Sequence, residues 1–217
     1  MIITAKLLKT LKAFSKINTG IKMTTGGRLM TMNPESTIFS IATFPITIDN
    51  TYEIYDLREF IKKCPAGSRI SVDDDKIKIE YSGVQAEVCS ATGAVIPPKK
   101  DITQQLHSPF FELNMNESLL RLIKKQCQGS KLHIRAESNV ISVVIEEVAN
   151  VSILAEAHRT TDDFKAVLKT SHMNKLGNGD MKVKIYNNGV AMFESIDTKT
   201  VFALESDSTF DKTPVIG

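Results

Sequence analysis

Lysine and arginine side chains recur on one side of four segments that carry a helical pattern of apolar residues. These segments are residues 4–18, 56–64, 114–128 and 169–176. In the first, Leu7, Leu11 and Phe14 follow the i, i+4, i+7 spacing of a buried helix face, and the lysines lie nearly opposite. The four segments hold twelve basic residues and only three acidic ones. Such cationic faces predict a surface that binds a polyanion.

Duplex DNA fits this surface, because its phosphates attract Lys and Arg regardless of base sequence. The sequence shows no helix-turn-helix pair, zinc finger or aromatic stacking platform, so we expect sequence-independent contact with double-stranded DNA. The predicted DNA-binding residues are Lys6, Lys9, Lys12, Lys16, Lys62, Lys63, Arg121, Lys124, Lys125, Lys169 and Lys175. The alternative is that Lys, a good helix former, simply faces solvent here. An ordinary solvated helix, however, alternates Glu with Lys.

The distribution of charge carries this prediction, since the formal net charge of the 217-residue chain is only +2. Residues with catalytic or metal-binding chemistry form no recognised motif: phosphate-loop, HExxH and GxSxG patterns are absent. The acidic run at residues 73–75 lacks the other ligands of a calcium loop and predicts a hairpin turn. Cys64, Cys89 and Cys127 form no CxxC pair, which predicts reduced thiols and no zinc site. We therefore expect no catalytic residue, no metal, no cofactor and no enzymatic activity.

The elements that carry these residues follow a repeated order along the chain. Asp56 with Glu59, and Asn114 with Glu117, have the spacing of a helix capping box. The predicted strands of the first half are residues 21–25, 28–32, 37–42, 47–55, 69–72, 76–81 and 84–89, and those of the second half are 131–136, 140–147, 151–157, 164–168, 181–186, 190–193 and 200–204. Each half thus reads as helix, four strands, helix, three strands. The corresponding helices start about 110 residues apart, which indicates an internal structural duplication.

Two vicinal prolines, Pro97 and Pro98, favour a semi-rigid connector between the halves. We predict an N-terminal domain over residues 1–92, a connector over 93–108 and a C-terminal domain over 109–217. Segregated helices and antiparallel strands give an α+β fold. No run approaches the roughly 18 apolar residues of a membrane span, so we expect no membrane association. The Lys-rich, acid-free residues 1–17 would also fit a transit peptide or a membrane-surface helix.

Three stretches resemble the sliding clamp of T-even bacteriophages, a PCNA-like DNA polymerase processivity factor. They are LKAFSKINTGI at residues 11–21, IYDLREF at 54–60 and ALESDSTFD at 203–211, which together cover 27 residues. Residues 64–108 are much less alike. The tail at residues 212–217 departs from the family pattern.

The resemblance implies a protomer of two clamp-type (DNA clamp) domains, each with two helices packed on curved antiparallel sheets. Three protomers would close head to tail into a homotrimeric ring, with strand 84–89 of one meeting strand 151–157 of the next. The helices would line a hole around duplex DNA. The implied partners are the DNA polymerase, an ATP-driven clamp loader and late-transcription factors, in the cytoplasm of the infected host cell.

The resemblance also implies an apolar pocket that captures short tails of partner proteins. Its predicted residues are Val95, Ile96, Pro97, Pro98 and Phe210, since they are apolar groups in polar, exposed segments. One alternative is that Ile96 and Phe210 anchor their segments to the core. Another is that residues 214–216 of the tail occupy the pocket of their own or a neighbouring ring.

Two other classes of protein fit the same pattern. A β-rich structural protein of a virion would use its sheet edges for assembly and leave the basic helices exposed. A monomeric, nonspecific DNA-binding module would dissociate from linear and circular DNA at the same rate. The size of the protein in solution distinguishes these alternatives from a ring.

Overall fold

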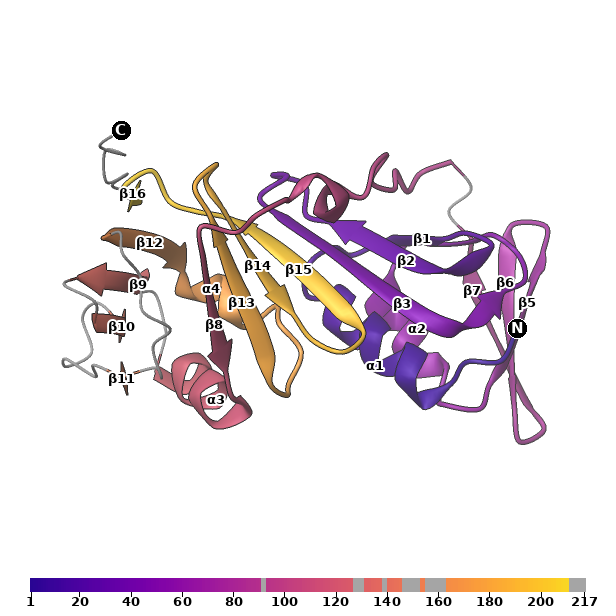
Figure 1. Ribbon diagram of the computed structural model, residues 1–217. Helices are drawn as coiled ribbons and strands as arrows, with labels where there is room; N and C mark the ends of the chain where they lie inside the picture. The colour runs from indigo at the N-terminus through magenta and orange to yellow at the C-terminus, as the bar shows by residue number, and fades with distance from the viewer. Residues whose placement is uncertain (91–92, 127–130, 138–139, 146–152, 155–162, 211–217) are drawn as a thin grey trace. The chain divides into compact units, whose positions relative to one another are not determined.

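The computed structural model describes residues 1–90, 93–126, 131–137, 140–145, 153–154 and 163–210. The chain forms two compact units, Met1–Asp101 and Ile102–Gly217 (Figure 1). The division falls inside the segment of residues 93–108.

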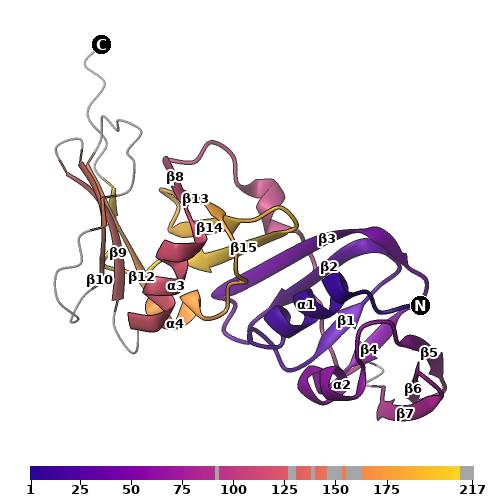
Figure 2. The same cartoon turned by 90° about the horizontal axis from the view of Figure 1, so that it is seen from below.

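The first unit holds the helices α1 (Ala5–Phe14) and α2 (Leu57–Lys63). Its strands are β1 (Ile21–Met23), β2 (Gly26–Met32), β3 (Ile38–Ile48), β4 (Tyr52–Ile54), β5 (Arg69–Asp73), β6 (Lys76–Tyr81) and β7 (Val84–Cys89). All strand pairs are antiparallel: β1 with β4, β2 with β3, and β5, β6 and β7 in that order. The two helices lie side by side; α1 also contacts β3, and α2 contacts β7 (Figure 2).

The second unit holds the short 3₁₀ helix η1 (Ile102–Gln105) and the helices α3 (Glu117–Gln126) and α4 (Thr170–Met173). Its strands are β8 (Phe111–Met115), β9 (Lys131–Glu137), β10 (Val140–Ile145), β11 (Ile153–Leu154), β12 (Phe164–Lys169), β13 (Met181–Tyr186), β14 (Val190–Glu194), β15 (Thr198–Ala203) and β16 (Thr209–Phe210). One sheet has the order β11-β10-β9-β12-β16, and β15, β14, β13 and β8 are neighbours in another. The helix α3 lies beside α4 (Figure 2).

The two units repeat one pattern of strand pairing. After the leading helix, the first strand pairs with the fourth, as β1 with β4 and β9 with β12. The second strand pairs with the third, as β2 with β3 and β10 with β11. After the second helix, three strands form an antiparallel meander in each unit. The predicted α+β fold of two similar domains is confirmed.

Side-chain caps start three of the helices, as short polar residues do where the first N–H groups lack intrahelical partners. The N–H of Leu7 donates to Thr4 Oγ1 (3.1 Å), and the N–H of Glu59 donates to Asp56 Oδ1 (2.9 Å), as predicted. The cap of α3 is Asn116, whose Oδ1 accepts from the N–H of Leu119 (2.8 Å).

The prediction that Asn114 caps α3 is wrong, because Asn114 lies in β8 opposite Lys182 of β13. Strand pairing continues through Met115, which delays the helix until Asn116. The predicted helix over residues 169–176 shortens to α4, because Lys169 is still paired with Lys131 of β9 as the last residue of β12.

Pro45 does not separate two strands as predicted. The strand β3 continues through it, and its pairing with β2 shifts between Gly26 and Arg28, which lie opposite Ile48 and Thr43. Proline cannot donate to a strand ladder, so it is tolerated at such an irregularity. Of the predicted strand 151–157, residues 153–154 form β11, and the others lie outside the described residues.

Candidate nucleic-acid interface

The cationic side of the first unit is built by α1 and α2. Leu7, Leu11 and Phe14 of α1 are buried, as are Leu57 and Phe60 of α2, so the opposite side of each helix faces outward. The exposed lysines on these outward sides are Lys9, Lys12, Lys62 and Lys63. The first turn of α1 contains no acidic residue.

Most of these lysines leave their ammonium groups available. Within the described residues, Lys9, Lys12 and Lys62 have neither an ion-pair nor a hydrogen-bond partner for their side chains. Lys63 differs, because its Nζ lies 2.7 Å from Glu59 Oε1 and donates to the carbonyl of Glu87 (3.2 Å). Lys6 and Lys16 interact with other groups of the chain.

The second unit engages more of its predicted cations internally. Arg121 pairs with Glu117 one turn earlier on α3, with Nη2 2.7 Å from Oε1. Lys169 Nζ lies 3.6 Å from Glu205 Oε1, and Lys175 interacts with other groups of the chain. Lys125 is exposed and has no partner among the described residues. Exposed ion pairs of this kind are worth about 0–1 kcal/mol, so Arg121 and Lys169 can still exchange their partners for a phosphate.

Lys124 is held more firmly than the other cations. Its Nζ donates to the carbonyls of Leu176 (3.0 Å) and Gly177 (2.8 Å) and to Asn178 Oδ1 (3.3 Å). These acceptors lie in the turn after α4, so Lys124 ties α3 to that turn. The helical spacing that placed Lys124 beside Lys125 could not reveal this, because the acceptors are about 50 residues away and two of them are backbone carbonyls.

One exposed cation on these helices is absent from the predicted interface. Arg58 lies on α2, is exposed, and has no side-chain partner among the described residues. Its place on the same predicted helix as Lys62 could have identified Arg58 as part of the interface.

His172 stands between Lys169 and Lys175 in the sequence but does not join the cationic surface. It is buried, and its ring stacks on Phe202 with centroids 5.1 Å apart. Its buried Nδ1 makes no hydrogen bond within the described residues. Burial lowers the pKa of His172, and the nearby Lys169 lowers it further. The imidazole is therefore neutral at neutral pH and belongs to the core.

The predicted partner-peptide residues fall in both units. Val95, Ile96, Pro97 and Pro98 belong to the first unit, and Phe210 belongs to the second. The side chain of Ile96 is 81% exposed, so it does not anchor the connector to the core. Phe210 does pack within its own unit, against Phe110 and Phe164 at centroid distances of 5.4 and 6.3 Å.

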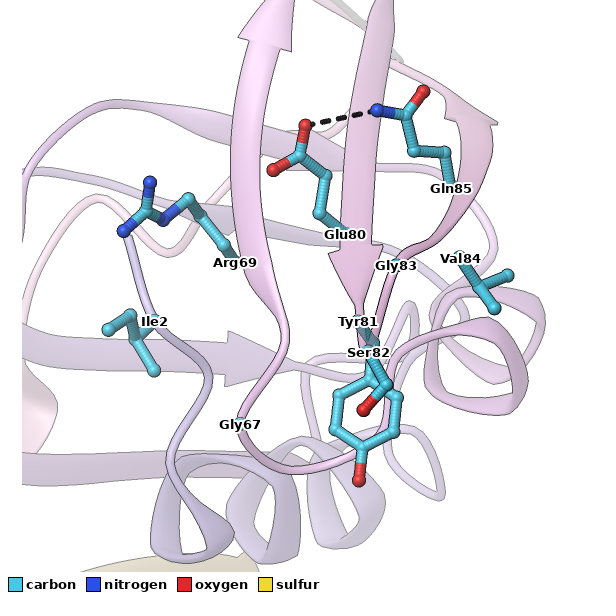
Figure 3. Close-up of a pocket in the computed structure, with 9 residues that line it drawn as sticks. All are labelled: Ile2, Gly67, Arg69, Glu80, Tyr81, Ser82, Gly83, Val84 and Gln85. Carbon is cyan, nitrogen blue, oxygen red and sulfur yellow. Dashed lines mark hydrogen bonds between the residues drawn. The ribbon is translucent and has the colours of Figure 1, made fainter.

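A pocket of about 390 Å³ lies at the turn between β6 and β7 (Figure 3). Ile2, Arg69, Tyr81 and Ser82 contribute to its lining. Its lining includes a serine hydroxyl but no histidine, lysine or cysteine. Glu80 also lines the pocket, and its Oε1 accepts a hydrogen bond from Gln85 Nε2 at 3.4 Å (Figure 3).

No group of three or more His, Cys, Asp or Glu side chains in the described part of the chain could hold a metal ion. Cys64 is buried and Cys89 is exposed, and both are free thiols; Cys127 lies outside the described residues. None of the helices within the described ranges is long and apolar enough to cross a membrane.

Comparison with known proteins relates this arrangement to sliding clamps. No protein-family model matches the chain. The chain is 24% identical to the sliding clamp of Escherichia phage RB69 over 221 residues, which cover 93% of this chain and 95% of that protein. Its fold also matches A. fulgidus PCNA bound to the C-terminal region of FEN-1, with a TM-score of 0.70 and 14% identity over 96% of this chain and 98% of that chain. The chain is thus similar to sliding clamps in both sequence and fold.

A second solved structure gives the same fold. The Helicobacter pylori β clamp bound to a DNA ligase peptide matches with a TM-score of 0.62 and 13% identity, covering all of this chain and 68% of the longer β clamp. The predicted resemblance to T-even phage clamps is confirmed by the match to the RB69 clamp. The sliding clamp fold also agrees with the repeated strand pairing of the two units.

Proposed function

We propose that three copies of this sliding clamp close head to tail into a ring that encircles duplex DNA and tethers the replicative DNA polymerase to it. The observation that carries the proposal is the acid-poor outward side of α1 and α2, where Lys9, Lys12 and Lys62 lack partners among the described residues. Lysines that are not engaged internally can neutralise phosphates without first losing another contact. The ring acts by topology and charge, and the clamp itself catalyses no reaction.

Two strand edges support head-to-tail assembly. Among the described strands, β7 is the last strand of the β5-β6-β7 sheet, and β11 is the first strand of its own sheet. Open edges carry unpaired N–H and C=O groups that can pair with another chain. We assign Val84–Cys89 of one protomer to pair with residues 151–157 of the next, which repeats around a closed ring.

The partners of the clamp follow from what its relatives bind. The A. fulgidus PCNA structure holds the C-terminal region of FEN-1, and the H. pylori β clamp holds a ligase peptide. For this chain we propose that a C-terminal peptide of the polymerase docks near Ile96, whose side chain is exposed. An ATP-driven loader opens the ring, and late-transcription factors use the same clamp in the cytoplasm of the infected host cell.

Charge reversal tests the DNA-facing assignment. In the double variant Lys12→Glu/Lys125→Glu, loading onto primed circular DNA should drop sharply, while the melting temperature should barely move, because exposed substitutions cost less than about 0.5 kcal/mol. The control Lys76→Glu/Lys182→Glu changes the net charge equally but on the strands β6 and β13. Its melting temperature is measured as well, because these lysines pair with Glu87 and Glu112. Equal loading by the two double variants would contradict the assignment of the helices to DNA.

Light scattering over a range of concentrations tests the ring itself. The wild-type chain should approach the mass of a trimer as concentration rises. A mass that stays at one chain up to high micromolar concentration would contradict head-to-tail closure.

A further inference from the structure

The segment of residues 93–101, here named the connector strap, crosses the first unit without helix or strand (Figure 1). Near its start, the N–H of Gly93 donates to Glu53 Oε2 at 2.6 Å. At its end, Asp101 Oδ2 lies 3.8 Å from Arg28 Nη1. Glu53 belongs to β4 and Arg28 to β2, so both ends of the strap contact strands of one unit.

Glu53 is an unusual residue to find inside a strand pair. Its side chain is 8% exposed, and its other carboxylate oxygen forms an ion pair with Lys22 of β1. The Lys22 ammonium, supported by the Gly93 N–H, holds the pKa of Glu53 below its usual value although burial opposes this. The group is therefore an anion at neutral pH, and a buried anion is tolerated only where such partners satisfy it.

The strap is also fitted closely to the strands between its two ends. Gly20 lies under Val95: a Cβ atom on Gly20 would come within 3.1 Å of Val95 Cγ2 and of the carbonyl oxygen of Ile54. The next residue, Ile96, is turned out, with 81% of its surface exposed. An exposed large apolar side chain contributes no burial to the stability of the chain, but it can contact another molecule.

We propose that Glu53 is a positioning residue for partner docking: its carboxylate locks Gly93 and so holds the strap with Ile96 presented to an apolar peptide. The inference rests on the proposed docking of a polymerase peptide near Ile96. A strap that is already ordered spares the peptide the entropic cost of ordering it. Glu53 itself need not touch the peptide.

Two double variants isolate the Gly93 hydrogen bond from the ion pair. Lys22→Met/Glu53→Gln removes both charges but keeps a side-chain carbonyl that can accept from the Gly93 N–H. Lys22→Met/Glu53→Leu removes both charges and the acceptor. Neither variant leaves an unpaired buried charge, so both should fold.

Hydrogen exchange of a peptide that covers residues 93–101, followed by mass spectrometry on the full-length clamp, reports the lock directly. Exchange in the Lys22→Met/Glu53→Leu variant should be about tenfold faster than in the Gln variant. Loss of one hydrogen bond shifts the equilibrium between the closed and the open strap by about a factor of ten. Affinity for a synthetic C-terminal peptide of the polymerase encoded by the same genome should fall about as much. Retention on circular DNA should be the same in both variants.

Three results would overturn the proposal. Equal exchange in the Gln and Leu variants would show that the Gly93 bond does not hold the strap. If Ile96→Ser binds the peptide poorly, Ile96 belongs to the docking site. Faster exchange in the Leu variant with unchanged peptide affinity would then show that the Gly93 hydrogen bond does not position Ile96. Unchanged peptide binding in Ile96→Ser would show that the docking site itself is misplaced, and DNA retention would then show whether the rest of the proposed function stands.

Discussion

Lys124 and Lys125 are adjacent lysines on α3 that differ in their contacts. Lys124 Nζ donates to Leu176, Gly177 and Asn178, whereas Lys125 has no partner among the described residues. Replacing each lysine with Met keeps an unbranched side chain of similar length and removes only the ammonium group. The pair therefore separates a lysine engaged within the second unit from one that we propose contacts DNA.

The expected loss of stability follows from the contacts. Hydrogen bonds to a charged group contribute about 1.5–3 kcal/mol when buried, but two of the three bonds to Lys124 are exposed, so we expect Lys124→Met to cost about 1–2 kcal/mol. Lys125→Met should cost less than about 0.5 kcal/mol. With a urea m-value of about 2 kcal/mol/M, the midpoint of Lys124→Met should fall by about 0.5–1 M.

DNA binding should respond in the opposite way. Each phosphate contact adds about 0.9 to the slope of log affinity against log salt concentration, so Lys125→Met should lower that slope by about 0.9. Lys124→Met should leave the slope unchanged. Urea unfolding and a salt titration with duplex DNA measure the two effects on the same proteins. Equal urea midpoints for the two variants, or equal salt slopes, would refute this division of roles.

Three further substitutions test local features of the fold. Because burial lowers the pKa of His172, its stabilising contribution is present above its ordinary pKa of 6.5 and is lost as the pH falls towards the lowered value. The free energy of unfolding, measured with urea, should therefore fall less between about pH 8 and about pH 5 for His172→Phe than for wild type. Asp56→Ala should lower the free energy of unfolding by about 1 kcal/mol through loss of the α2 cap, whereas Asp56→Asn should keep it. Gly20→Ala should cost about 1–3 kcal/mol because its Cβ would meet Val95 and backbone, while Gly177→Ala, which meets nothing within 4 Å, should lower the melting temperature far less.

Much of the fold could be predicted because apolar periodicity and turn residues are local signals. The Asp56 cap and most of the predicted strands came from such signals and agree with the structure, whereas β8 and β16 were not predicted. The start of α3 could not be predicted from local signals, because Asn114 and Asn116 are equally good caps. The pairing of β8 with β13 decides between them. The predicted strand break at Pro45 is wrong for the same reason. The irregularity that tolerates a proline there lies in the pairing of β3 with β2, which the local sequence does not show.

The candidate site was predictable as a surface but not as a set of available charges. Helical spacing gave the outward side of each helix, and that side holds Lys9, Lys12, Lys62 and Lys125. It could not show that Lys124 is bound to a turn formed about 50 residues later. It also could not show that Glu53, in a strand, reaches Gly93 across 40 positions. Contacts between residues distant in sequence depend on tertiary packing, which local patterns do not encode.

The lifetime of the clamp on circular and linear DNA tests ring closure around DNA most directly. Clamps are loaded with the ATP-driven loader onto a nicked circular plasmid, free protein is removed, and half of the sample is cut once with a restriction enzyme. A closed ring should stay on the circle and leave the cut DNA quickly by sliding off its ends. Equal lifetimes on the circular and the cut plasmid would contradict encirclement and favour a protein that binds DNA by charge alone.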